Sequence, residues 1–376
     1  FTYLGPVDGH DVKGLTRLLT YARDLKAPVL LHVRTVKGKG YTPAEHNPDQ
    51  FHGVGRFCVE TGEVMKSGGV NFSAVFGQTL CRMAEEDPRL CAITAAMQGG
   101  TGLDSFAERF PDRFFDVGIA EGHAVAMAAG MAKQGMVPVF AVYSSFLQRA
   151  YDMLIHDVAL QGLHVVFCVD RAGLVGEDGE THHGVFDPAF LDTVPGMTVL
   201  CPSSYPELER MFRYAVCQVD GPVAVRYPRG GQGAYQADSG PERAVVLRSG
   251  KDITLTGYGI TINALLDCAQ RLEADGIQAE VLKLNTITPL DLDAVAASVQ
   301  RTGCLLTAEE AVPGNSVGQR LAAGLLERGI SAKAAQVNTG PGFVPHGSVE
   351  QLRALCGLDG ASLYKKALEV CGNGDG

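Results

Sequence analysis

The period with which hydrophobic and polar residues alternate predicts most elements of the chain. Near its start, apolar residues at helical spacing predict a helix over 12–25, and a short apolar run predicts a strand over 29–33. The stretch 37–41, rich in Gly and Lys, suits neither element and predicts a loop. One helix and one strand cannot build a sheet of their own, so we expect residues 1–57 to be the tail of a larger domain.

The middle of the chain alternates between strand and helix patterns. The strands that we expect are at 90–95, 114–119, 137–143, 164–170, 198–201 and 223–227. The helices that we expect are at 121–134, 145–160 and 206–219. This alternation is typical of parallel strands with helices on both faces of the sheet. The run 137–142 is apolar without interruption, as in a strand that is buried on both faces. We therefore expect an α/β domain with a parallel sheet over residues 70–230.

A second, smaller α/β domain is expected over residues 245–376. Its predicted strands, which are separated by helical patterns, are at 253–258, 279–284, 304–308 and 334–337. Two stretches, 60–69 and 230–242, lose this periodicity and gather Gly, Ser, Pro and charged residues, which predicts linkers. A length of 376 residues agrees with two or three domains. With 46% hydrophobic and 20% charged residues, the chain has the composition of a globular protein.

Charge and cysteine content exclude several classes of function. The chain has 32 Lys and Arg against 42 Asp and Glu, and no basic cluster of the kind that binds nucleic acid. No apolar run approaches the roughly 20 residues of a membrane helix, so we expect no membrane partner. Its 10 cysteines form no C-x-x-C pair, which favours reduced thiols and a cytoplasmic protein. Because the chain begins with Phe1, we expect an N-terminal part that was removed or lies on another chain.

Polar and aromatic residues follow the strands expected in the middle domain. Ligands of open α/β sheets bind beyond the carboxyl ends of the strands, so these positions are the ones most informative about function. They hold Glu121, Tyr143, Phe146, Arg171 and, in the loop after the strand 164–170, Asp178, His182 and His183. Residues of this kind at the ends of several neighbouring strands predict a functional site.

Each of these residues also has an ordinary structural explanation. Glu121 begins a predicted helix, where the helix dipole favours an acidic residue whatever the function. Aromatic residues are often core residues, and arginines near strand ends, such as Arg171 and Arg226, often pair with surface acids. The pair His182 and His183 fits solvated loop residues or metal ligands, although it lacks the spacing of a zinc site. Only their combination in one domain favours a catalytic site.

Several longer strings resemble known families. The string DVGIAEGHAV at 116–125 resembles the pyrimidine-ring motif of transketolase-like thiamine diphosphate enzymes. Further strings are similar to the 1-deoxy-D-xylulose-5-phosphate synthase family: YSSFLQRAYD at 143–152, DRAGLVGEDGETH at 170–182, RYPRG at 226–230, YLGPVDGH at 3–10 and GKGYTPAE at 38–45. The resemblance covers essentially the whole chain. It implies a transketolase-like α/β fold, with a parallel-sheet pyrimidine-binding domain followed by a smaller C-terminal domain.

The resemblance also implies an activity. Members of this family are transferases that decarboxylate pyruvate and join the two-carbon unit to D-glyceraldehyde 3-phosphate, which gives 1-deoxy-D-xylulose 5-phosphate and CO2. The product feeds isoprenoid and thiamine synthesis. The cofactors are thiamine diphosphate and Mg2+, and the resemblance implies a cytoplasmic homodimer.

Three residues match the family's contacts to the cofactor. Glu121 matches the carboxyl that binds the ring nitrogen of the aminopyrimidine and promotes its imino tautomer. Phe146 matches the aromatic residue that stacks on the pyrimidine. Tyr41, in the loop of the first segment, matches a further cofactor contact.

Other residues match the contacts to the substrates. Arg171 and Arg226, with Tyr143 beside them, match the positions that bind the acceptor's phosphate, for which the planar guanidinium is well suited. His52 and His182 match residues that transfer protons near neutral pH.

Asp178 matches a residue that orients or polarises these groups, and with His52, His182 and Glu121 it completes the catalytic set that the resemblance implies.

The chain departs from the family's pattern in two places. Gly122 stands where the family usually has Gln after the catalytic Glu. The Gly-Asp-Gly motif, which with a later Asn binds magnesium and the diphosphate, is absent from this sequence. We therefore expect no metal ligand in this chain, and an enzyme that is inactive without an N-terminal part. The alternatives are a non-catalytic chain, or a β-type subunit of a split transketolase or 2-oxo acid dehydrogenase that needs a partner chain. The string at 170–182 argues against the β-type subunit.

Overall fold

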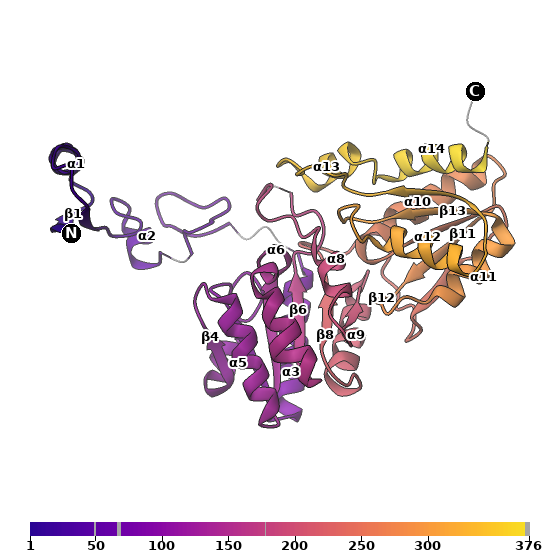
Figure 1. Ribbon diagram of the computed structural model, residues 1–376, viewed down its shortest axis with the longest axis horizontal. Coiled ribbons are helices and arrows are strands. Elements are labelled where there is room, and N and C mark those ends of the chain that lie inside the picture. The colour runs from indigo at the N-terminus through magenta and orange to yellow at the C-terminus, as the bar shows by residue number, and fades with distance from the viewer. Residues whose placement is uncertain (49, 66–68, 177, 373–376) are drawn as a thin grey trace. The chain divides into compact units, whose positions relative to one another are not determined.

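The structure is a computed structural model that describes residues 1–48, 50–65, 69–176 and 178–372. The chain forms two compact units, Phe1–Gly69 (unit 1) and Val70–Gly376 (unit 2). Figure 1 labels the elements of both units along a colour scale that begins in indigo at the N-terminus.

Unit 1 is a β-α-β segment followed by loops. The strands β1 (Thr2–Asp8) and β2 (Val29–Arg34) pair in parallel, and α1 (Val12–Asp24) connects them. The helix and β2 confirm the predicted elements, but the prediction of a single strand was wrong because β1 was missed. A proline inside β1 hides the strand pattern, and the pairing with β2 changes register around it.

The apolar residues of unit 1 are largely uncovered. No residue of α1 is buried, and Tyr3, Leu19 and Leu30 are each more than half exposed. A lone β-α-β segment has no second layer against which its apolar face can pack. A short helix, α2 (Thr42–His46), lies in the loop region that follows.

The first sheet of unit 2 has seven strands in the order β12-β7-β8-β6-β5-β3-β4. Its strands are β3 (Leu90–Thr94), β4 (Phe114–Asp116), β5 (Val137–Tyr143), β6 (Val166–Asp170), β7 (Thr198–Leu200), β8 (Val223–Arg226) and β12 (Thr286–Thr288). The strands β3 to β8 are parallel, as predicted. The edge strand β12 is antiparallel to β7 and comes from the C-terminal part of the chain. No strand was predicted at β12.

Helices cover both faces of this sheet (Figure 1). They are α3 (Phe72–Glu86), α4 (Asp104–Arg109), α5 (Glu121–Lys133), α8 (Asp187–Asp192) and α9 (Tyr205–Cys217). Along β5, Val139 and Ala141 join the apolar cluster of α3 and α9, while Phe140 and Val142 join the cluster of α5. The strand is therefore buried on both faces, as its uninterrupted apolar run predicted.

The helix predicted over 145–160 is a chain of shorter turns. It consists of α6 (Ser144–Leu147), a 3-10 turn (Gln148–Ala150), α7 (Tyr151–Met153), a π turn (Leu154–Val158) and a second 3-10 turn (Ala159–Gln161). Such changes of helical pitch are frequent at functional sites. The segment leads directly away from the carboxyl end of β5.

The second sheet of unit 2 has five strands in the order β14-β13-β10-β11-β9. Its strands are β9 (Ala244–Arg248), β10 (Ile253–Gly257), β11 (Ala279–Leu284), β13 (Cys304–Ala308) and β14 (Lys333–Val337). The helices around it are α10 (Ile262–Ala274), α11 (Leu292–Thr302), α12 (Val317–Glu327), α13 (Val349–Leu355) and α14 (Gly360–Cys371). Its strands are parallel except for β9, which was not predicted and lies antiparallel to β11.

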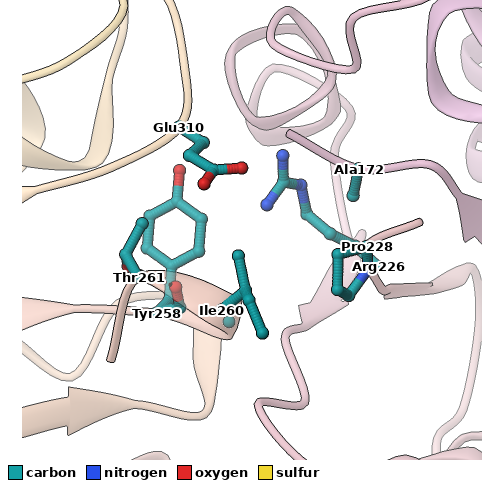
Figure 2. A pocket seen from close by; sticks show the side chains of 8 residues that line it. Ala172, Arg226, Pro228, Tyr258, Ile260, Thr261 and Glu310 are labelled. Carbon is teal, nitrogen blue, oxygen red and sulfur yellow. Dashed lines mark hydrogen bonds between the residues drawn. The ribbon is translucent and has the colours of Figure 1, made fainter. Parts of the chain in front are cut away.

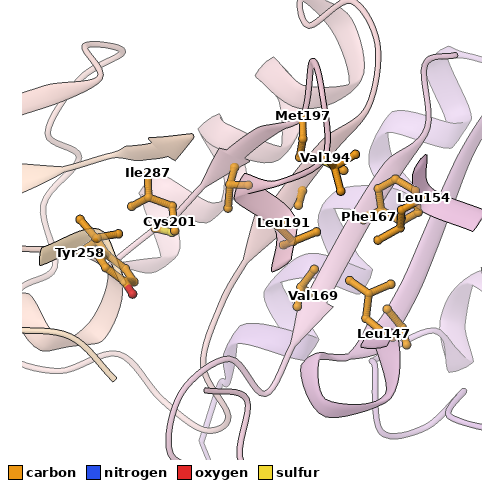
Figure 3. Packing of buried hydrophobic residues seen from close by; sticks show 14 of the residues in the cluster. Leu147, Leu154, Phe167, Val169, Leu191, Val194, Met197, Cys201, Tyr258 and Ile287 are labelled. Carbon is orange, nitrogen blue, oxygen red and sulfur yellow. The ribbon is translucent and has the colours of Figure 1, made fainter. Parts of the chain in front are cut away.

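The two sheets of unit 2 share one apolar core. Tyr258 and Ile287 from the C-terminal part belong to the same buried cluster as Cys201 and Leu191 from the first sheet (Figure 3). This shared core, together with β12, fixes the two parts of unit 2 against each other.

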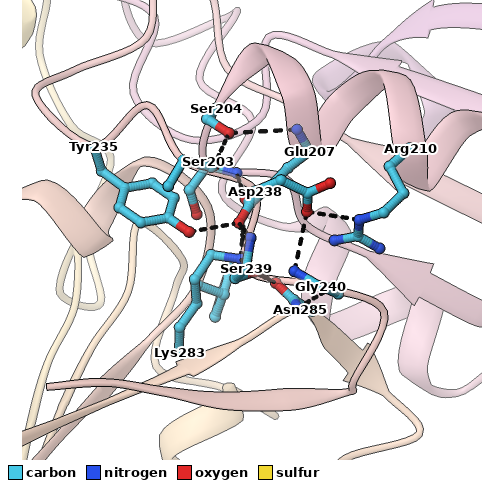
Figure 4. Close-up of polar contacts among 12 residues, drawn as sticks. Ser203, Ser204, Glu207, Arg210, Tyr235, Asp238, Ser239, Gly240, Lys283 and Asn285 are labelled. Atoms are coloured by element: carbon cyan, nitrogen blue, oxygen red, sulfur yellow. Dashed lines mark hydrogen bonds and ion pairs between the residues drawn. The ribbon is translucent and has the colours of Figure 1, made fainter.

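A buried ion pair holds the stretch 230–242, which was predicted as a linker. Glu207 of α9 and Lys283 of β11 are fully buried with 3.0 Å between Oε2 and Nζ, and Tyr235 and Ser239 donate to Glu207 at 2.9 and 2.6 Å (Figure 4). Burial alone would raise the pKa of Glu207, but Lys283 and the hydrogen bonds from Ser239 and the Ser203 amide lower it. The stretch is therefore anchored to both parts of unit 2.

The ten cysteines are all free thiols. Among the described residues, no helix combines the length and the apolar character that a membrane span requires.

Candidate active site

A row of three side chains starts at the carboxyl end of β5. Tyr143, Phe146 and Arg149 are three residues apart in helical turns, so their side chains line up. The rings of Tyr143 and Phe146 stack with 5.8 Å between their centroids and 24° between their planes. The guanidinium carbon of Arg149 lies 4.7 Å from the centroid of the Phe146 ring. Phe146 thus contacts both an aromatic ring and a cation.

Arg171 extends this row from the end of β6. Its guanidinium carbon lies 3.8 Å from the centroid of the Tyr143 ring, and its Nη1 donates to the Gly100 carbonyl at 2.8 Å. Arg171 has a φ of 58°, a left-handed conformation that is rare for residues other than Gly and concentrates at functional sites. Asp170 supports it through a 3.2 Å ion pair. Burial raises the pKa of Asp170, although Arg171 and a hydrogen bond from Ser73 oppose this.

Tyr143 is enclosed at its hydroxyl end. A Cβ added to Gly100 would lie 1.8 Å from the Tyr143 hydroxyl oxygen, so a larger residue at position 100 would force the phenol or the loop to move. Burial raises the pKa of Tyr143, and Arg171 opposes this rise in part. The phenol is therefore protonated at neutral pH and can donate a hydrogen bond.

Glu121 begins α5 and continues the row at its other end. The turn before it depends on Gly118, which has a φ of 70° and whose amide donates to the Asp116 carboxylate at 2.9 Å. Glu121 is only 3% exposed, and its Oε1 lies 2.5 Å from Nη1 of Arg149. Its Oε2 accepts no hydrogen bond from the part of the chain that the structure describes. Glu121 lies in the first turn of α5, where the helix dipole stabilises an acidic residue.

Gly122, which follows Glu121, has little space for a side chain. A Cβ at Gly122 would lie 2.9 Å from Cε of Met153 in α7. Met153 therefore fills the space that a longer side chain at position 122 would need, as a flexible Met readily does.

The loop after β6 places its two histidines differently. His182 meets the edge of the Phe146 ring with 5.3 Å between centroids, and its Nδ1 lies 2.8 Å from the Thr181 hydroxyl. His183 is buried, accepts from the Val175 amide at Nδ1, and its Nε2 lies 3.1 Å from the Pro345 carbonyl. His182 therefore belongs to the row, whereas His183 fixes the loop to the C-terminal part.

Asp178 lies in the same loop and pairs with Arg229. The distance between Asp178 Oδ2 and Arg229 Nη1 is 3.0 Å, and the same Nη1 donates to the Val175 carbonyl at 2.9 Å. The charge of Asp178 raises the pKa of Tyr143 and the charge of Arg229 lowers it, as expected for a pair close to the row.

Arg226 lies apart from the row, at the end of β8. Its Nε and Nη2 donate to the buried Asp187 at 2.7 and 3.2 Å, and Nη2 also donates to the Gly184 carbonyl at 3.0 Å. Burial would lower the pKa of Arg226, but Asp187 raises it overall, so Arg226 stays charged. Asp187 also accepts from Ser144, the neighbour of Tyr143, at 2.9 Å. Arg226 is thus connected to the row through Asp187.

Arg226 also lines a cavity of about 10 Å³, roughly the size of one water molecule (Figure 2). Tyr258, Thr261 and Glu310 of the C-terminal part line its other side. Glu310 accepts from the Leu174 amide at 2.9 Å and so holds the beginning of the loop after β6.

Tyr41 and His52 belong to unit 1. The Tyr41 hydroxyl donates to the Val59 carbonyl at 2.8 Å, and its ring packs against Phe51 and Phe57 with centroid distances of 5.5 and 6.0 Å. His52 is exposed.

The row fits a flat, basic heterocycle. Phe146 offers an aromatic ring, and Glu121 offers a buried carboxylate whose Oε2 is left for a ligand. Such a heterocycle can stack on the one and form a hydrogen bond to the other. In the described ranges, no group of three or more His, Cys, Asp or Glu residues is arranged to hold a metal ion.

Comparison with known proteins shows which families the chain resembles. Residues 68–232 match the transketolase pyrimidine-binding domain, 242–363 the transketolase C-terminal domain, and 1–35 the model named 1-deoxy-D-xylulose-5-phosphate synthase. Proteins named 1-deoxy-D-xylulose-5-phosphate synthase from Heliobacterium modesticaldum and Pelotomaculum thermopropionicum are 45% and 47% identical over 98% of this chain. The chain is similar over nearly its whole length to proteins named 1-deoxy-D-xylulose-5-phosphate synthase. It spans 58% and 59% of the length of these two relatives.

Solved structures confirm the transketolase-like α/β fold. A protein titled split gene transketolase, inactive beta4 tetramer, is 27% identical with a TM-score of 0.71, and the match covers 80% of this chain and 99% of that one. The Campylobacter jejuni transketolase shares the fold with a TM-score of 0.68, 17% identity and coverage of 80% and 46%. The split-gene protein is thus less similar to this chain than the synthase relatives are.

Sequence reasoning missed Arg149 and Arg229, which the structure places at or near the row. Arg149 lies in the string 143–152, and its spacing from Tyr143 and Phe146 is the signal that could have identified it. Arg229 lies in the string RYPRG beside Arg226, and the sequence does not show which of the two faces Asp178.

Proposed function

We propose that this chain forms the pyrimidine-binding side of a 1-deoxy-D-xylulose-5-phosphate synthase active site. Its substrates are then pyruvate and D-glyceraldehyde 3-phosphate, and its products are 1-deoxy-D-xylulose 5-phosphate and CO2. The observation that carries this proposal is the continuous row from Arg171 through Tyr143, Phe146 and Arg149 to Glu121. It combines a phosphate-binding cation, an aromatic surface and a buried carboxylate at the carboxyl ends of neighbouring strands.

Glu121 and Phe146 hold the cofactor ring in this proposal. Thiamine diphosphate, when bound, supplies the electron sink that pyruvate decarboxylation requires. Glu121 shares a proton with the ring nitrogen, and its burial keeps water from competing for that hydrogen bond. Phe146 provides the stacking surface, and Tyr41 of unit 1 is proposed as a further cofactor contact. We propose that the Mg2+ ligands lie in the part of the relatives' length that this chain does not span.

Arg171 and Arg226, with Tyr143, are proposed to bind the acceptor's phosphate. Arg171 packs against the Tyr143 ring, and this position makes its guanidinium available to the phosphate. Arg226 can reach a phosphate only with the two N–H groups on Nη1, because Asp187 and Gly184 accept from its Nε and Nη2. Arg229, which is about one-third exposed, is an alternative second cation.

His182 is proposed as a proton carrier for the substrate oxygens. Its contact with the edge of Phe146 places its imidazole beside the stacking surface. Asp178 is proposed to orient the reacting groups, and its ion pair with Arg229 fixes its carboxylate. His52 of unit 1 is proposed as a second proton carrier.

The remaining proposals concern organisation. We assign residues 1–57 to the end of a diphosphate-binding domain, 70–230 to the pyrimidine domain and 245–376 to the C-terminal domain. We propose a cytoplasmic homodimer that supplies isoprenoid and thiamine precursors.

A second candidate function is a β-type chain that needs a separate partner. Its support is the similarity to the split gene transketolase, which matches over 99% of that chain's length. The higher identity to the synthase relatives favours the first proposal.

The test uses a completed enzyme, in which this chain is joined to the N-terminal part of the Heliobacterium modesticaldum relative. With thiamine diphosphate and Mg2+, it should form 1-deoxy-D-xylulose 5-phosphate from pyruvate and D-glyceraldehyde 3-phosphate, and the chain alone should not. Two-carbon transfer from a ketose phosphate without consumption of pyruvate would support the transketolase alternative instead.

A further inference from the structure

Arg149 connects the two residues that are proposed to hold the cofactor ring. Its Nη1 lies 2.5 Å from Oε1 of Glu121, and its guanidinium carbon lies 4.7 Å from the centroid of Phe146. No other described side chain contacts both residues in this way. Neither contact was anticipated from the sequence, and the family comparison assigns no role to Arg149.

The burial of the two partners is unequal. Glu121 is 3% exposed and Arg149 is 49% exposed. A buried carboxylate is costly without a cation or hydrogen-bond donors. Arg149 donates the one hydrogen bond that the described side chains give to Glu121. The ion pair therefore matters more to Glu121 than an ordinary surface pair would, since surface pairs contribute little.

The contact uses only one of the two carboxylate oxygens. Arg149 binds Oε1 and leaves Oε2 without a partner among the described residues. A carboxylate that is fixed at one oxygen can offer the other in a defined direction, which is the arrangement that a hydrogen bond to a ring nitrogen requires.

Arg149 is itself held in place. The Phe146 ring attracts the guanidinium by a cation–π interaction. The turn Gln148–Ala150 that carries Arg149 leads into Met153, which packs against Gly122 beside Glu121. The position of Arg149 is therefore coupled to both the aromatic ring and the start of α5.

We propose that Arg149 is a positioning residue, which fixes Glu121 through Oε1 so that Oε2 faces the ring nitrogen of the bound aminopyrimidine. The inference rests on the proposed function, because it concerns the same cofactor. It goes beyond that function in assigning the orientation of the essential carboxylate to a further side chain of the row.

The test compares Arg149→Met and Arg149→Lys in the completed enzyme, with Arg82→Met as the matched control. Arg82 is 48% exposed and forms a surface pair with Glu209 at 3.1 Å, so it resembles Arg149 in exposure but lies outside the site. Two quantities are measured: cofactor affinity by calorimetry, and the rate at which the thiazolium C2 proton of bound thiamine diphosphate exchanges with deuterium, by quenched NMR. The exchange reports proton removal at the cofactor without any substrate.

Arg149→Met should slow the exchange about tenfold or more, the size expected for losing a hydrogen bond to a charged group. Cofactor affinity should change less than about threefold, because most of the affinity comes from contacts elsewhere on the cofactor. Arg149→Lys should recover part of the exchange rate, since an ammonium can pair with Oε1 but lacks the flat guanidinium. Arg82→Met should change neither quantity.

Three results would overturn the inference. An unchanged exchange rate in Arg149→Met would make the ion pair incidental. Tighter cofactor binding with undiminished exchange would show that Arg149 competes with the ring for Phe146 and Glu121. Failure of the unmodified completed enzyme to bind thiamine diphosphate would overturn the proposed function, and this inference with it. Because Arg149 is half exposed, its variants should fold, and thermal unfolding by circular dichroism verifies this.

Discussion

Asp187 accepts two hydrogen bonds from Arg226, at 2.7 and 3.2 Å, and both side chains are buried. Removing one partner of such a pair leaves an uncompensated buried charge. Arg226→Met should therefore lower the free energy of unfolding by about 3–5 kcal/mol, as measured by urea titration.

Arg213→Met is the control for this variant. Arg213 lies 3.9 Å from Glu86 in a pair whose side chains are both more than 40% exposed, so its loss should cost less than about 1 kcal/mol. A similarly small effect of Arg226→Met would show that the Asp187 pair does not support the fold.

Arg171 should act on the acceptor's phosphate. In the completed enzyme, Arg171→Ala should lower kcat/KM for D-glyceraldehyde 3-phosphate about tenfold or more, since a hydrogen bond to a charged group contributes about 1.5–3 kcal/mol. The kcat/KM for unphosphorylated D-glyceraldehyde should hardly change. The two kcat/KM values are compared in the same way for Arg226→Lys and Arg229→Met. The variant that loses kcat/KM only for the phosphorylated aldehyde identifies the second phosphate contact. Equal losses on both aldehydes would assign Arg171 to the support of Tyr143 instead.

Gly100 should be needed for the position of Tyr143. In Gly100→Ala, the new Cβ would lie 1.8 Å from the Tyr143 hydroxyl oxygen, so the ring or the loop must move. We expect a loss of about 1–3 kcal/mol of stability from this overpacking. The neighbouring Gly99→Ala is the control, because its Cβ would meet nothing closer than 3.5 Å. If the two variants had the same melting temperature, the close contact at Gly100 would be refuted.

Glu207 should make stability depend on pH in the acid range. Its pKa is lowered in the folded state, so its stabilising contribution is complete above the ordinary value of 4.5 and is lost as the pH falls through the folded value. The unfolding free energy should therefore decrease on going from pH 6 to pH 4, and Glu207→Gln should reduce this decrease. Glu209→Gln, on the same helix but in a surface pair, should leave the pH dependence unchanged. Identical pH profiles for all three proteins would contradict the prediction.

The sequence predicted those elements whose pattern is local. The strand β5 was predicted with its observed bounds because its apolar run is continuous. The helix α3 was missed. It contains Gly77, which is explained only by tertiary packing, because a Cβ there would lie 2.0 Å from the Gly102 carbonyl oxygen. The three-residue strand β12 exists through its pairing with β7, which no local pattern shows.

The candidate site was predicted to a similar extent. Residue types at strand ends indicated Glu121, Phe146 and Arg171, and the structure brings them into one row with Tyr143 and His182. The sequence did not show which residues form hydrogen bonds or ion pairs with the candidate site residues. Asp187 is separated from Arg226 by 39 positions, and only the fold shows that it occupies much of that guanidinium. Such pairings depend on tertiary structure and leave no periodic signal in the sequence.

Glu121 is proposed as the carboxyl that activates the cofactor ring. The most direct measurement is the steady-state turnover of the completed enzyme with Glu121→Gln, at saturating cofactor and with the fold verified by circular dichroism. An amide can hydrogen-bond to the ring but cannot exchange the proton, so kcat should fall by about 10²- to 10⁴-fold. A variant that kept more than about one-tenth of the original turnover would contradict the claim, since so small a change is less than the roughly 10²-fold that a proton-transfer group contributes, and Glu121 would then be only an acidic residue at the start of a helix.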